Sequence, residues 1–582
     1  MKNISVTIIL IFYAFTNLNA QNEITFDLKA VPFSYYGSYM VINSRINNNN
    51  NANKTPEFFF SDVSGTGRSR EEAKFKIETL QNGKLITCSA IATPSKVTLT
   101  NGSATCEICY EDCNTLRFRA IGMDLRLVCD RSYRYCFPTK KGQWLIPSYV
   151  FTSIKGEAEN KVDAGKKTTF TFYSDGSKSA EFAIENFTGG HKNRDFKPFD
   201  DCVKGAVQVI NKWISQYPPC DKKYRNTLDL ALYINWSSVV EPRENMTQYG
   251  MFMSKNQMCN VWSWDNCFNA IGTAYGQPDL AWAQIQVMFD HQYKAGNFPD
   301  CLNDYASIKA FVKPPVYGLI IKNLIEKNKI NKNQLPDIYN RISALTNFWL
   351  EYRDLNGNGI PEYFHGNDSG WDNSSVFNVG FANESADLCT FLICQMDFLA
   401  EIAPQAGKPS EAKYWIIKSD KMLKLMLANL WEDNHFVSKN NTTGLWNKES
   451  KALLQYIPLI LGERLPKEYR VKIISDLKKS GNFTQHGVAS EDPVSPFYKP
   501  DGYWLGPIWA PSSWLIIKGL DKCGEKALAK ELAEKYCDMC IKSGFPENFN
   551  ALTGEPLRDL AYTWTSSVFI DLLYEYVSPV KK

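Results

Sequence analysis

Apolar residues in the first 200 positions recur in short runs that suit β-strands. Such runs lie at Phe58–Phe60, Ala73–Ile77 and Leu116–Ala120, and the last two alternate between apolar and polar residues. Alternation with a period of two is typical of a strand that buries one face. Gly, Asn and Ser separate the runs at short intervals, as in two packed antiparallel sheets. The pattern predicts a β-sandwich domain over residues 21–200.

After about residue 201 the apolar period changes to that of helices, and Val203–Ile210 opens the first amphipathic run. Further helical segments are expected at Leu228–Tyr233, Trp282–Phe289, Pro315–Ile325, Ile338–Tyr352, Leu388–Ile402, Lys413–Leu430, Tyr469–Leu477, Ser513–Leu520, Lys526–Cys540 and Trp564–Tyr576. This succession predicts an all-α toroid of helix pairs over residues 201–582. A solenoid has the same helical period, but the segment lacks the fixed internal repeat that most solenoids show.

The N-terminus has the pattern of a targeting segment. Met1 and Lys2 precede a largely apolar run from Ile4 to Phe15, and Ala20 follows as a small residue. A basic start, a short apolar stretch and a small residue at its exit are typical of a cleaved signal peptide. The run is shorter than the roughly 20 residues that a membrane-spanning helix needs, and no later stretch qualifies. We expect residues 1–20 to be a signal peptide and the mature chain to be exported (periplasmic, secreted or in a secretory lumen), without a stable membrane span.

The 16 cysteines of an exported chain can form disulfides, because oxidising compartments permit them. Five of them crowd one short stretch, namely Cys106, Cys109, Cys113, Cys129 and Cys136. Cys106 and Cys109 have the C-x-x-C spacing of zinc ligands. Disulfides are the favoured prediction for an exported chain, although the sequence does not give their pairing.

Charge and composition exclude some classes of partner. The chain has 65 Lys and Arg against 62 Asp and Glu, a formal net charge of +3. A chain this close to neutral lacks the excess of positive charge with which proteins bind nucleic acid or an anionic membrane. Aromatic residues make up 13% of the chain. Large helical proteins bury many aromatic side chains, and flat aromatic faces also suit the apolar faces of sugar rings.

The loops between the predicted helices hold the informative residues. In Val261–Phe268, Trp262 and Trp264 precede Asp265. Two Trp side chains beside a carboxylate can stack on a sugar while the Asp accepts hydrogen bonds from its hydroxyls. The alternative is that both Trp belong to the core and that Asp265 caps a helix.

A second loop has the alternating oxygen side chains of a calcium site. Its expected ligands are Asp354, Asn356, Asn358, the carbonyl of Ile360 and Glu362. This spacing matches the start of an EF-hand loop, with Gly359 at the tight turn. His365 stands where an EF-hand has its bidentate Glu. We therefore expect Ca²⁺ with a further ligand from elsewhere, and the alternative is an Asn- and Gly-rich turn without metal.

Two other loops each place a carboxylate among aromatic residues. Gly366–Ser375 contains Trp371 and Asp372, and Phe545–Gly554 contains Glu547. Asp372 is a candidate general acid, because an apolar neighbour such as Trp371 disfavours the charged form of a carboxyl group and raises its pKa. Each is also consistent with an ordinary loop carboxylate. The two residues lie 175 positions apart, so only the fold can bring them together.

Five motifs occur in one order, namely W-x-W-D, D-x-N-x-N-G-x-P-E, S-G-W-D-N-S, Y-W-L-G-P-I-W around Trp504, and F-x-E-N-F-N-A-L-T-G. Together they resemble glycoside hydrolase family 63, the inverting α-glucosidases, whose clan includes the trehalases. The resemblance covers about residues 255–570. It implies an (α/α)6 barrel preceded by a β-sandwich, a general acid at Asp372, a general base at Glu547 and a sugar contact at Asp265. Some members of the family bind calcium in the D-x-N-x-N loop.

The resemblance implies an exo-acting, inverting α-glucosidase that hydrolyses oligosaccharides. Asp372 would protonate the leaving oxygen while Glu547 activates water on the opposite face of the sugar, with the carboxyl groups about 6.5–9.5 Å apart. The substrate-binding residues expected beside them are Trp262, Trp264, Asp265, Trp371 and Trp504. A trehalase or another α-glycosidase of the clan is an alternative. A non-catalytic sugar-binding relative is disfavoured, because both carboxylates stand at their motif positions.

Overall fold

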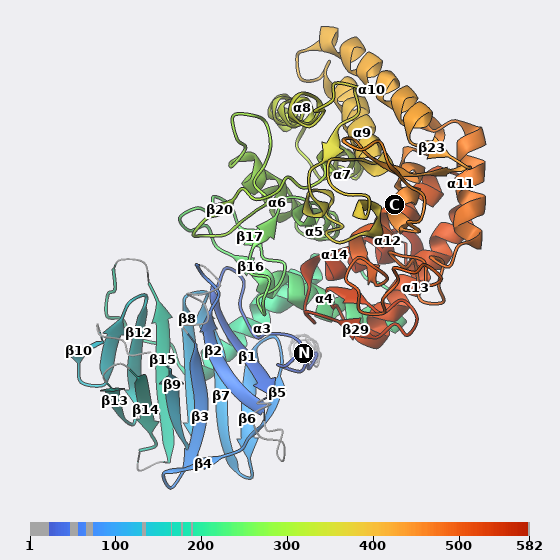
Figure 1. Cartoon of the computed structure of the whole chain (residues 1–582). Coiled ribbons are helices and arrows are strands. Elements are labelled where there is room, and N and C mark those ends of the chain that lie inside the picture. Colours follow the sequence, from blue (N-terminus) through green and yellow to red (C-terminus); the bar gives the residue numbers. More distant parts are fainter. Residues whose placement is uncertain are drawn as a thin grey trace, which may run out of the picture.

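The computed structural model describes residues 23–46, 56–65, 74–130, 136–163, 166–175, 178–187 and 190–579. The expected signal peptide, residues 1–20, lies outside these ranges. The described chain has a β-rich N-terminal domain of antiparallel sheets and a helical C-terminal domain (Figure 1). The predicted change from strands to helices is confirmed, since β15 ends at Asn186 and α3 begins at Phe199.

Two antiparallel sheets form the N-terminal domain. The first has the order β1-β2-β3-β9-β14-β13, with β4 paired to β3, and the second has the order β10-β11-β12-β15-β8-β7-β6-β5. The strands are β1 Met40–Ile46, β2 Pro56–Asp62, β3 Phe75–Gln81, β4 Lys84–Ile86, β5 Ser89–Ala92, β6 Lys96–Asn101, β7 Ala104–Asp112, β8 Thr115–Ile121, β9 Asp124–Cys129, β10 Phe137–Lys140, β11 Gln143–Ile146, β12 Tyr149–Lys155, β13 Glu157–Asp163, β14 Lys167–Tyr173 and β15 Ser179–Asn186.

The two sheets pack face to face through aromatic side chains. Phe172 of β14 stacks on Phe182 of β15 with ring centroids 3.7 Å apart, and Phe170 stacks on Phe151 of β12 at 4.1 Å. Each pair joins the first sheet to the second, and all four residues are at most 1% exposed. Alternate residues of the strands therefore point into one shared core, as the period of two predicts.

The helical domain is built around a ring of six elements. The helices are α3 Phe199–Ser215, α4 Arg225–Ser238, α5 Asp265–Thr273, α6 Pro278–Phe289, α7 Tyr317–Glu326, α8 Leu335–Tyr352, α9 Ala386–Ile402, α10 Pro409–Asn429, η5 Leu453–Arg464, α11 Lys467–Lys479, α12 Ala510–Lys522, α13 Lys526–Ser543 and α14 Thr563–Leu572. In the ring, α5, α7, α9, η5, α12 and α14 each pack against the next, and α14 closes onto α5. The other helices cover it from outside; α6 packs on α5, α10 on α9 and α13 on α12.

Short strands shape the loops that precede the ring helices. They include β18 Val261–Trp262, β19 Cys301–Leu302, β21 Glu362–Tyr363, β22 Asn383–Glu384, β27 Ile508–Trp509 and β28 Asn548–Phe549. Each predicted catalytic or sugar-binding carboxylate stands at or before the start of a ring helix; Asp265 begins α5, Asp372 precedes α9 and Glu547 precedes α14. The motif loops therefore belong to the N-terminal ends of the ring helices.

The segment before β1 joins the β-rich domain to the helical one. The fully buried Lys255 donates from Nζ to Ser34 Oγ at 3.1 Å and to the carbonyls of Ser38 at 2.5 Å and Val239 at 3.0 Å. Phe26 stacks on Tyr233 of α4 with ring centroids 4.7 Å apart. Three hydrogen-bond acceptors offset the cost of burying this ammonium group. The two domains therefore share an ordered interface.

The prediction of disulfides in the cysteine-rich stretch is not met. Cys106, Cys109, Cys113 and Cys136 are free thiols in the structure. Cys106 and Cys109 lie three positions apart on β7, so their side chains point to opposite faces of the sheet. Cys106 enters the core between the sheets, whereas Cys109 packs against α3. The same alternation argues against the C-x-x-C zinc alternative.

None of the helices in the described ranges combines the length and the apolar composition needed to cross a bilayer.

Candidate active site

The loop that contains Asp372 is tied to the loop that contains Trp504. The neighbouring Asn373 donates from Nδ2 to the carbonyl of Gly502 at 3.0 Å and accepts the backbone N–H of Trp504 at 2.9 Å. Gly366 is required upstream, because a Cβ at this position would clash with the carbonyl oxygen of Asp372. Two of the motifs that lie far apart in sequence thus hold each other in position.

Asp368 connects the Asp372 loop to two other segments. Its Oδ2 pairs with Arg353 Nη1 at 2.8 Å and accepts the backbone N–H groups of Phe364 at 2.9 Å and His365 at 3.2 Å. Its Oδ1 accepts the backbone N–H of Val312 at 2.9 Å. Four partners on one carboxylate fix the course of the loop, and they place the segment before α7 beside it.

That segment brings a buried cation to Asp372. Lys313 Nζ lies 3.6 Å from Asp372 Oδ1 and 3.5 Å from Asp300 Oδ1, and it donates to the carbonyl of Asn367 at 2.8 Å. Burial lowers the pKa of Lys313, but the carboxyl groups of Asp372, Asp300 and Asp265 outweigh this effect and raise it overall. Lys313 is therefore ionised. We call Asp265, Asp300, Lys313 and Asp372 the acid-side cluster.

Asp265 is the most strongly perturbed member of the acid-side cluster. It is the first residue of α5 and is only 5% exposed. Burial raises its pKa to about 8; Lys313 opposes this rise, whereas Asp372 and Asp300 add to it. At neutral pH Asp265 therefore holds a proton for most of the time, which lets it donate as well as accept a hydrogen bond.

Glu547 lies in a second, buried environment. The residue is 7% exposed; its backbone N–H donates to the carbonyl of Asp559 at 2.6 Å and its carbonyl accepts Trp564 Nε1 at 3.2 Å. Burial raises the pKa of its carboxyl group to about 7, with a further rise from Asp559 and an opposing effect of Arg558. A carboxyl group with a pKa near neutrality is suited to accepting a proton at neutral pH.

Tyr503 lies close enough to both carboxyl groups to be affected by their charges. Its hydroxyl hydrogen-bonds the carboxyl group of Glu547, and its pKa is raised first by burial and then by the charges of Asp372, Glu547 and Asp265. Its backbone has φ +63°, a left-handed conformation that an aromatic residue rarely adopts. Such strain is concentrated at functional sites. The fold therefore gathers both predicted catalytic carboxyl groups, and Asp265 with them, around one side chain.

Three of the predicted substrate-binding tryptophans do not present open faces. Trp264 and Trp504 are 1% exposed and Trp371 is 0% exposed. Trp504 lies between the other two, with ring centroids 4.7 Å from Trp371 and 6.4 Å from Trp264. In the structure these three rings therefore pack against one another instead of lying open to a sugar. Trp262 is partly exposed.

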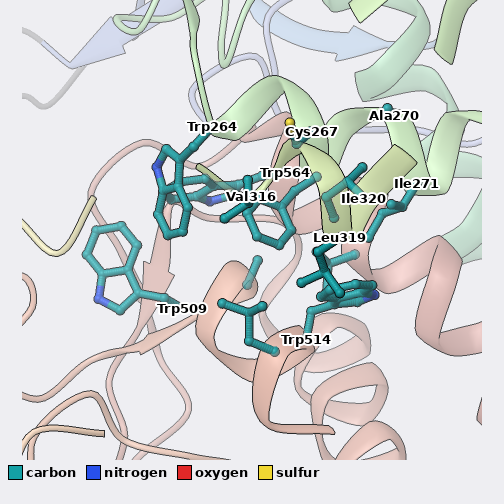
Figure 2. Packing of buried hydrophobic residues seen from close by; sticks show 14 of the residues in the cluster. Trp264, Cys267, Ala270, Ile271, Val316, Leu319, Ile320, Trp509, Trp514 and Trp564 are labelled. Carbon is teal, nitrogen blue, oxygen red and sulfur yellow. The ribbon is translucent and has the colours of Figure 1, made fainter. Parts of the chain in front are cut away.

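The buried tryptophans continue into the core of the ring. Trp504 stacks on Trp509 at 4.0 Å with an interplanar angle of 5°, and Trp564 meets Trp509 edge-on at 5.6 Å. Figure 2 shows Trp264, Trp509 and Trp564 gathered at one end of this packed cluster, with Trp514 farther along it. Tight aromatic packing of this kind limits the motion of the side chains that neighbour the carboxyl groups.

The predicted calcium loop follows α8 and is joined by a carboxylate that sequence analysis missed. Glu362 of β21 and Glu384 of β22 are direct cross-strand partners, and both are 0% exposed. Asn358 donates from Nδ2 to Glu384 Oε1 at 2.7 Å. Burial raises the pKa of Glu362 to about 7, helped by the charges of Asp354 and Glu384. We call Asp354, Glu362 and Glu384 the loop cluster.

The donor chemistry of the loop cluster fits a hard cation. Asp354 Oδ1 and Glu384 Oε2 are buried and have no hydrogen-bond partner. Like charges directly opposite on paired strands repel each other, and no lysine or arginine forms an ion pair with these three groups in the described ranges. Among the described residues, no three or more His, Cys, Asp or Glu side chains stand in the arrangement of a metal site. A cation would therefore need the oxygens of Asn356, Asn358 and Ile360 as well.

Four residues of these two clusters and their surroundings were not predicted from the sequence, namely Lys313, Asp300, Tyr503 and Glu384. Lys313 precedes Pro314 and Pro315 at the start of a predicted helix, which was the one available signal. Tyr503 lies within a motif but next to the more conspicuous Trp504. Asp300 and Glu384 belong to no recognisable spacing, so only the fold assigns them to a site.

Comparisons with known proteins agree with this geometry. The family model of the mannosylglycerate hydrolase MGH1-like glycoside hydrolase domain matches residues 258–565. A mannosylglycerate hydrolase from Thermus thermophilus is 20% identical over 385 residues, which cover 53% of this chain and 92% of that protein. A glucosylglycerate hydrolase from Mycolicibacterium hassiacum is 22% identical over 414 residues, covering 54% and 92%.

Solved structures show the fold. The GH63 mannosylglycerate hydrolase from Thermus thermophilus in complex with glucose has a TM-score of 0.52 at 20% identity and covers 59% of this chain and 98% of that one. A bacterial glucoamylase complexed with acarbose has a TM-score of 0.59 at 12% identity and covers 96% and 98%. The matched family model spans more than half of the chain; the chain belongs to the MGH1-like family of glycoside hydrolases within GH63 and is a glycoside hydrolase.

Proposed function

We propose that this glycoside hydrolase is an exo-acting, inverting α-glucosidase of oligosaccharides, with Asp372 as general acid and Glu547 as general base. The observation that supports it best is the convergence of Asp372, Glu547 and Asp265 around Tyr503. The ring of six packed helical elements is in keeping with an (α/α)6 barrel, and the two face-to-face sheets with a β-sandwich.

In this mechanism Asp372 donates its proton to the glycosidic oxygen as the bond to the aglycone breaks. Glu547, on the opposite face of the sugar, removes a proton from the water that attacks the anomeric carbon. Lys313 Nζ, 3.6 Å from Asp372 Oδ1, stabilises the carboxylate that Asp372 becomes once it has given up its proton, and Tyr503 positions Glu547. Asp265 hydrogen-bonds the sugar held between them. A single displacement from an α-glucoside releases β-glucose.

The loop cluster supports a structural Ca²⁺ site in this enzyme. The ligands would be Asp354, Asn356, Asn358, the carbonyl of Ile360 and Glu362, and Glu384 would supply the further ligand that the loop lacks. Calcium prefers six to eight hard oxygen ligands. When bound it would neutralise the paired Glu362 and Glu384 carboxylates. The loop would then be ordered upstream of Asp372, which lies ten positions after Glu362.

A second candidate activity comes from the relatives. Proteins named mannosylglycerate hydrolase and glucosylglycerate hydrolase match the catalytic region, and glycerate is an anionic aglycone. The acid-side cluster disfavours an anionic aglycone, because its cation, Lys313, already contacts two carboxyl groups. We therefore place neutral α-glucosides first.

A substrate panel separates these candidates. Purified enzyme is incubated with kojibiose, nigerose, maltose, trehalose, glucosylglycerate and mannosylglycerate, and free sugar is measured. We expect release of glucose from a neutral α-disaccharide, with the β-anomer first in proton NMR spectra. Preferential hydrolysis of a glycerate substrate would replace the first candidate by the second, and initial release of the α-anomer would overturn inversion.

A further inference from the structure

A pocket of about 440 Å³ lies between the β-rich and helical domains. Lys29, Asn43, Ser44 and Arg45 line it from the N-terminal side. Asn256, Gln257, Arg558, Asp559 and Leu560 line it from the helical side. Both domains are therefore needed to build it.

Asn43 is aimed across this interface and lacks a partner. Along β1, Met40 and Ile42 enter the core between the sheets, whereas Val41 enters the core of the helical domain. Because side chains alternate along a strand, Asn43 faces the helical domain as Val41 does. Asn43 is 6% exposed, and its Oδ1 has no hydrogen-bond partner; Oγ of the adjacent Ser44 has none either.

The opposite wall of the pocket is the segment that supports Glu547. The carbonyl of Asp559 accepts the Glu547 backbone N–H at 2.6 Å. Asp559 Oδ1 is held by Asn256 Nδ2 at 3.2 Å and by the backbone N–H of Ala561 at 3.1 Å. The Arg558 guanidinium lies 5.9 Å from the centre of the Tyr503 ring. The pocket thus adjoins the catalytic base through one short segment.

The polar groups of the pocket suit a sugar better than a simple anion. Unsatisfied acceptors such as Asn43 Oδ1 need a ligand that donates hydrogen bonds, and an inorganic anion such as sulfate has none to give. Lys29 and Arg558 offer donors at the rim, although Arg558 is also paired with Asp501 at 2.7 Å. Neighbouring hydroxyl groups of a sugar both donate and accept, so they satisfy both kinds of group at once.

The pocket also lies partly outside what this chain shares with the matched family. The family model begins at residue 258, so Lys29, Asn43 and Asn256 precede it. A site that requires β1 cannot belong to the shared catalytic domain alone. It is a property of the two-domain arrangement of this chain.

We propose that this interdomain pocket is an accessory sugar-binding subsite, which holds a glycosyl unit of the substrate distant from the bond that is cleaved. The proposal rests on the proposed function for the identity of the substrate. The β-rich domain then contributes to substrate binding rather than only to stability. Binding energy gained in the pocket acts equally on the substrate and the transition state, so it lowers KM for longer substrates without raising kcat.

The test compares chain lengths in three variants. Maltose to maltopentaose, or the same lengths in the linkage that the disaccharide panel selects, are assayed with wild-type enzyme, Asn43→Leu and Lys29→Gln. For substrates long enough to reach the pocket, we expect KM to rise about five- to tenfold in Asn43→Leu and about two- to fivefold in Lys29→Gln, with kcat and disaccharide kinetics unchanged. Lys472→Gln, an exposed lysine on α11, is the matched control.

Two results would overturn the subsite. One is an equal KM for all lengths in wild type and variants while disaccharides are hydrolysed, which leaves the proposed function intact. If no substrate is hydrolysed, titration calorimetry of maltotetraose with wild type and Asn43→Leu decides alone; equal binding, or none, overturns the subsite. Stronger binding of inorganic sulfate than of maltotetraose would also overturn it. A melting temperature within about 2 °C of wild type shows that Asn43→Leu is folded. If Asn43→Leu does not fold, the kinetics of Lys29→Gln alone test the subsite.

Discussion

In the acid-side cluster, Lys313 lies within 3.6 Å of Asp372 and 3.5 Å of Asp300. In the loop cluster, Glu362 and Glu384 are paired directly across two strands and have no lysine or arginine in ion-pair contact within the described ranges. Both clusters bury several carboxyl groups upstream of α9. They differ in whether the chain itself supplies the compensating cation.

That difference separates two ways of tolerating buried charge. An unpaired buried carboxylate is costly, so it is paired, protonated or bound to a metal. The acid-side cluster combines an ion pair between Lys313 and Asp300 with a proton on Asp265. The loop cluster has only protonation or an added cation. This difference is why we propose proton transfer at the first cluster and cation-dependent order at the second.

The largest expected effect comes from removing the two proposed catalytic groups. Asp372→Asn and Glu547→Gln should each lower kcat by about 10²- to 10⁴-fold, the range of general acid–base catalysis. Both substitutions keep the shape of the side chain, so the melting temperature should change little. Steady-state kinetics on the best disaccharide measure the effect.

Glu555→Gln provides the matched control for Glu547→Gln, because Glu555 is an exposed carboxylate of the same loop. It should retain wild-type turnover. Near-wild-type turnover of Asp372→Asn or Glu547→Gln would contradict the assignment of that residue, whatever the substrate.

The next effect tests whether Lys313 balances the acid-side cluster. Lys313→Gln leaves the buried Asp300 carboxylate without its cation, and breaking a buried ion pair by removing one partner costs about 3–5 kcal/mol. We expect a lower melting temperature together with a lower kcat. Lys313→Arg keeps the charge and should recover part of both, whereas Lys309→Gln, an exposed lysine nearby, should change neither. Wild-type stability and kcat in Lys313→Gln would show that the lysine compensates nothing.

The sequence predicted the parts of the structure that depend on local periodicity or on a recognisable motif. The helical runs correspond to α3, α4 and the long helices that follow, because amphipathic spacing directly reflects burial of one face. The short α5 and the 3₁₀ segment η5 were not predicted, because α5 is buried on all sides and so has no amphipathic pattern, and η5 contains Pro458. Asp372 and Glu547 were predicted as acid and base through their motifs; in the structure both lie near Tyr503, and their catalytic roles stay a prediction.

What the sequence could not supply depends on contacts between distant segments. Lys313 and Glu384 stand in no recognisable local pattern, because the side chains that they contact lie 13 or more positions away along the chain. The alternation of side chains along a strand separates two of the cysteines. Cys106 and Cys109 have the spacing of a pair in sequence, but they lie on opposite faces of β7. Similarly, Trp371 and Trp504 were expected beside the sugar, and only packing shows that their faces are covered.

Calcium should distinguish the loop cluster from the acid-side cluster. A ligand that binds only the folded state stabilises it by about 2.7 kcal/mol at a hundredfold excess over its Kd, which corresponds to a rise of a few degrees in melting temperature. EDTA should lower the melting temperature, Ca²⁺ should restore it, and Asp354→Ala should abolish the difference. Lys313→Gln should still respond to Ca²⁺, because its defect lies in the other cluster.

Asp195→Ala, an exposed aspartate remote from both clusters, is the control and should respond to Ca²⁺ as the wild type does. Elemental analysis must show that the chelated protein is free of metal. Identical melting curves with and without Ca²⁺ on such protein would mean that the loop cluster is compensated by protonation instead.

The smallest effect concerns the pH dependence of Glu547, which has no lysine beside it. Its pKa is raised to about 7, chiefly by burial, and a general base must be ionised to act. Activity should therefore be lost as the pH falls through about 7. The value of kcat/KM should fall about tenfold per pH unit below that point, because kcat/KM reports the free enzyme. The group is protonated below its pKa, so the sign is fixed: acid conditions inactivate, and the loss is reversible.

Arg558→Gln sharpens this prediction. The Arg558 charge lowers the pKa of Glu547, so its removal should move the acid limb to higher pH. The guanidinium is partly exposed and paired with Asp501, and solvent screens such a charge, which limits the shift to a fraction of a pH unit. Lys499→Gln removes an exposed charge of the same sign and serves as a control that should leave the acid limb in place. An acid limb near pH 4.5, or a shift to lower pH in Arg558→Gln, would mean that Glu547 is not the group whose ionisation limits catalysis.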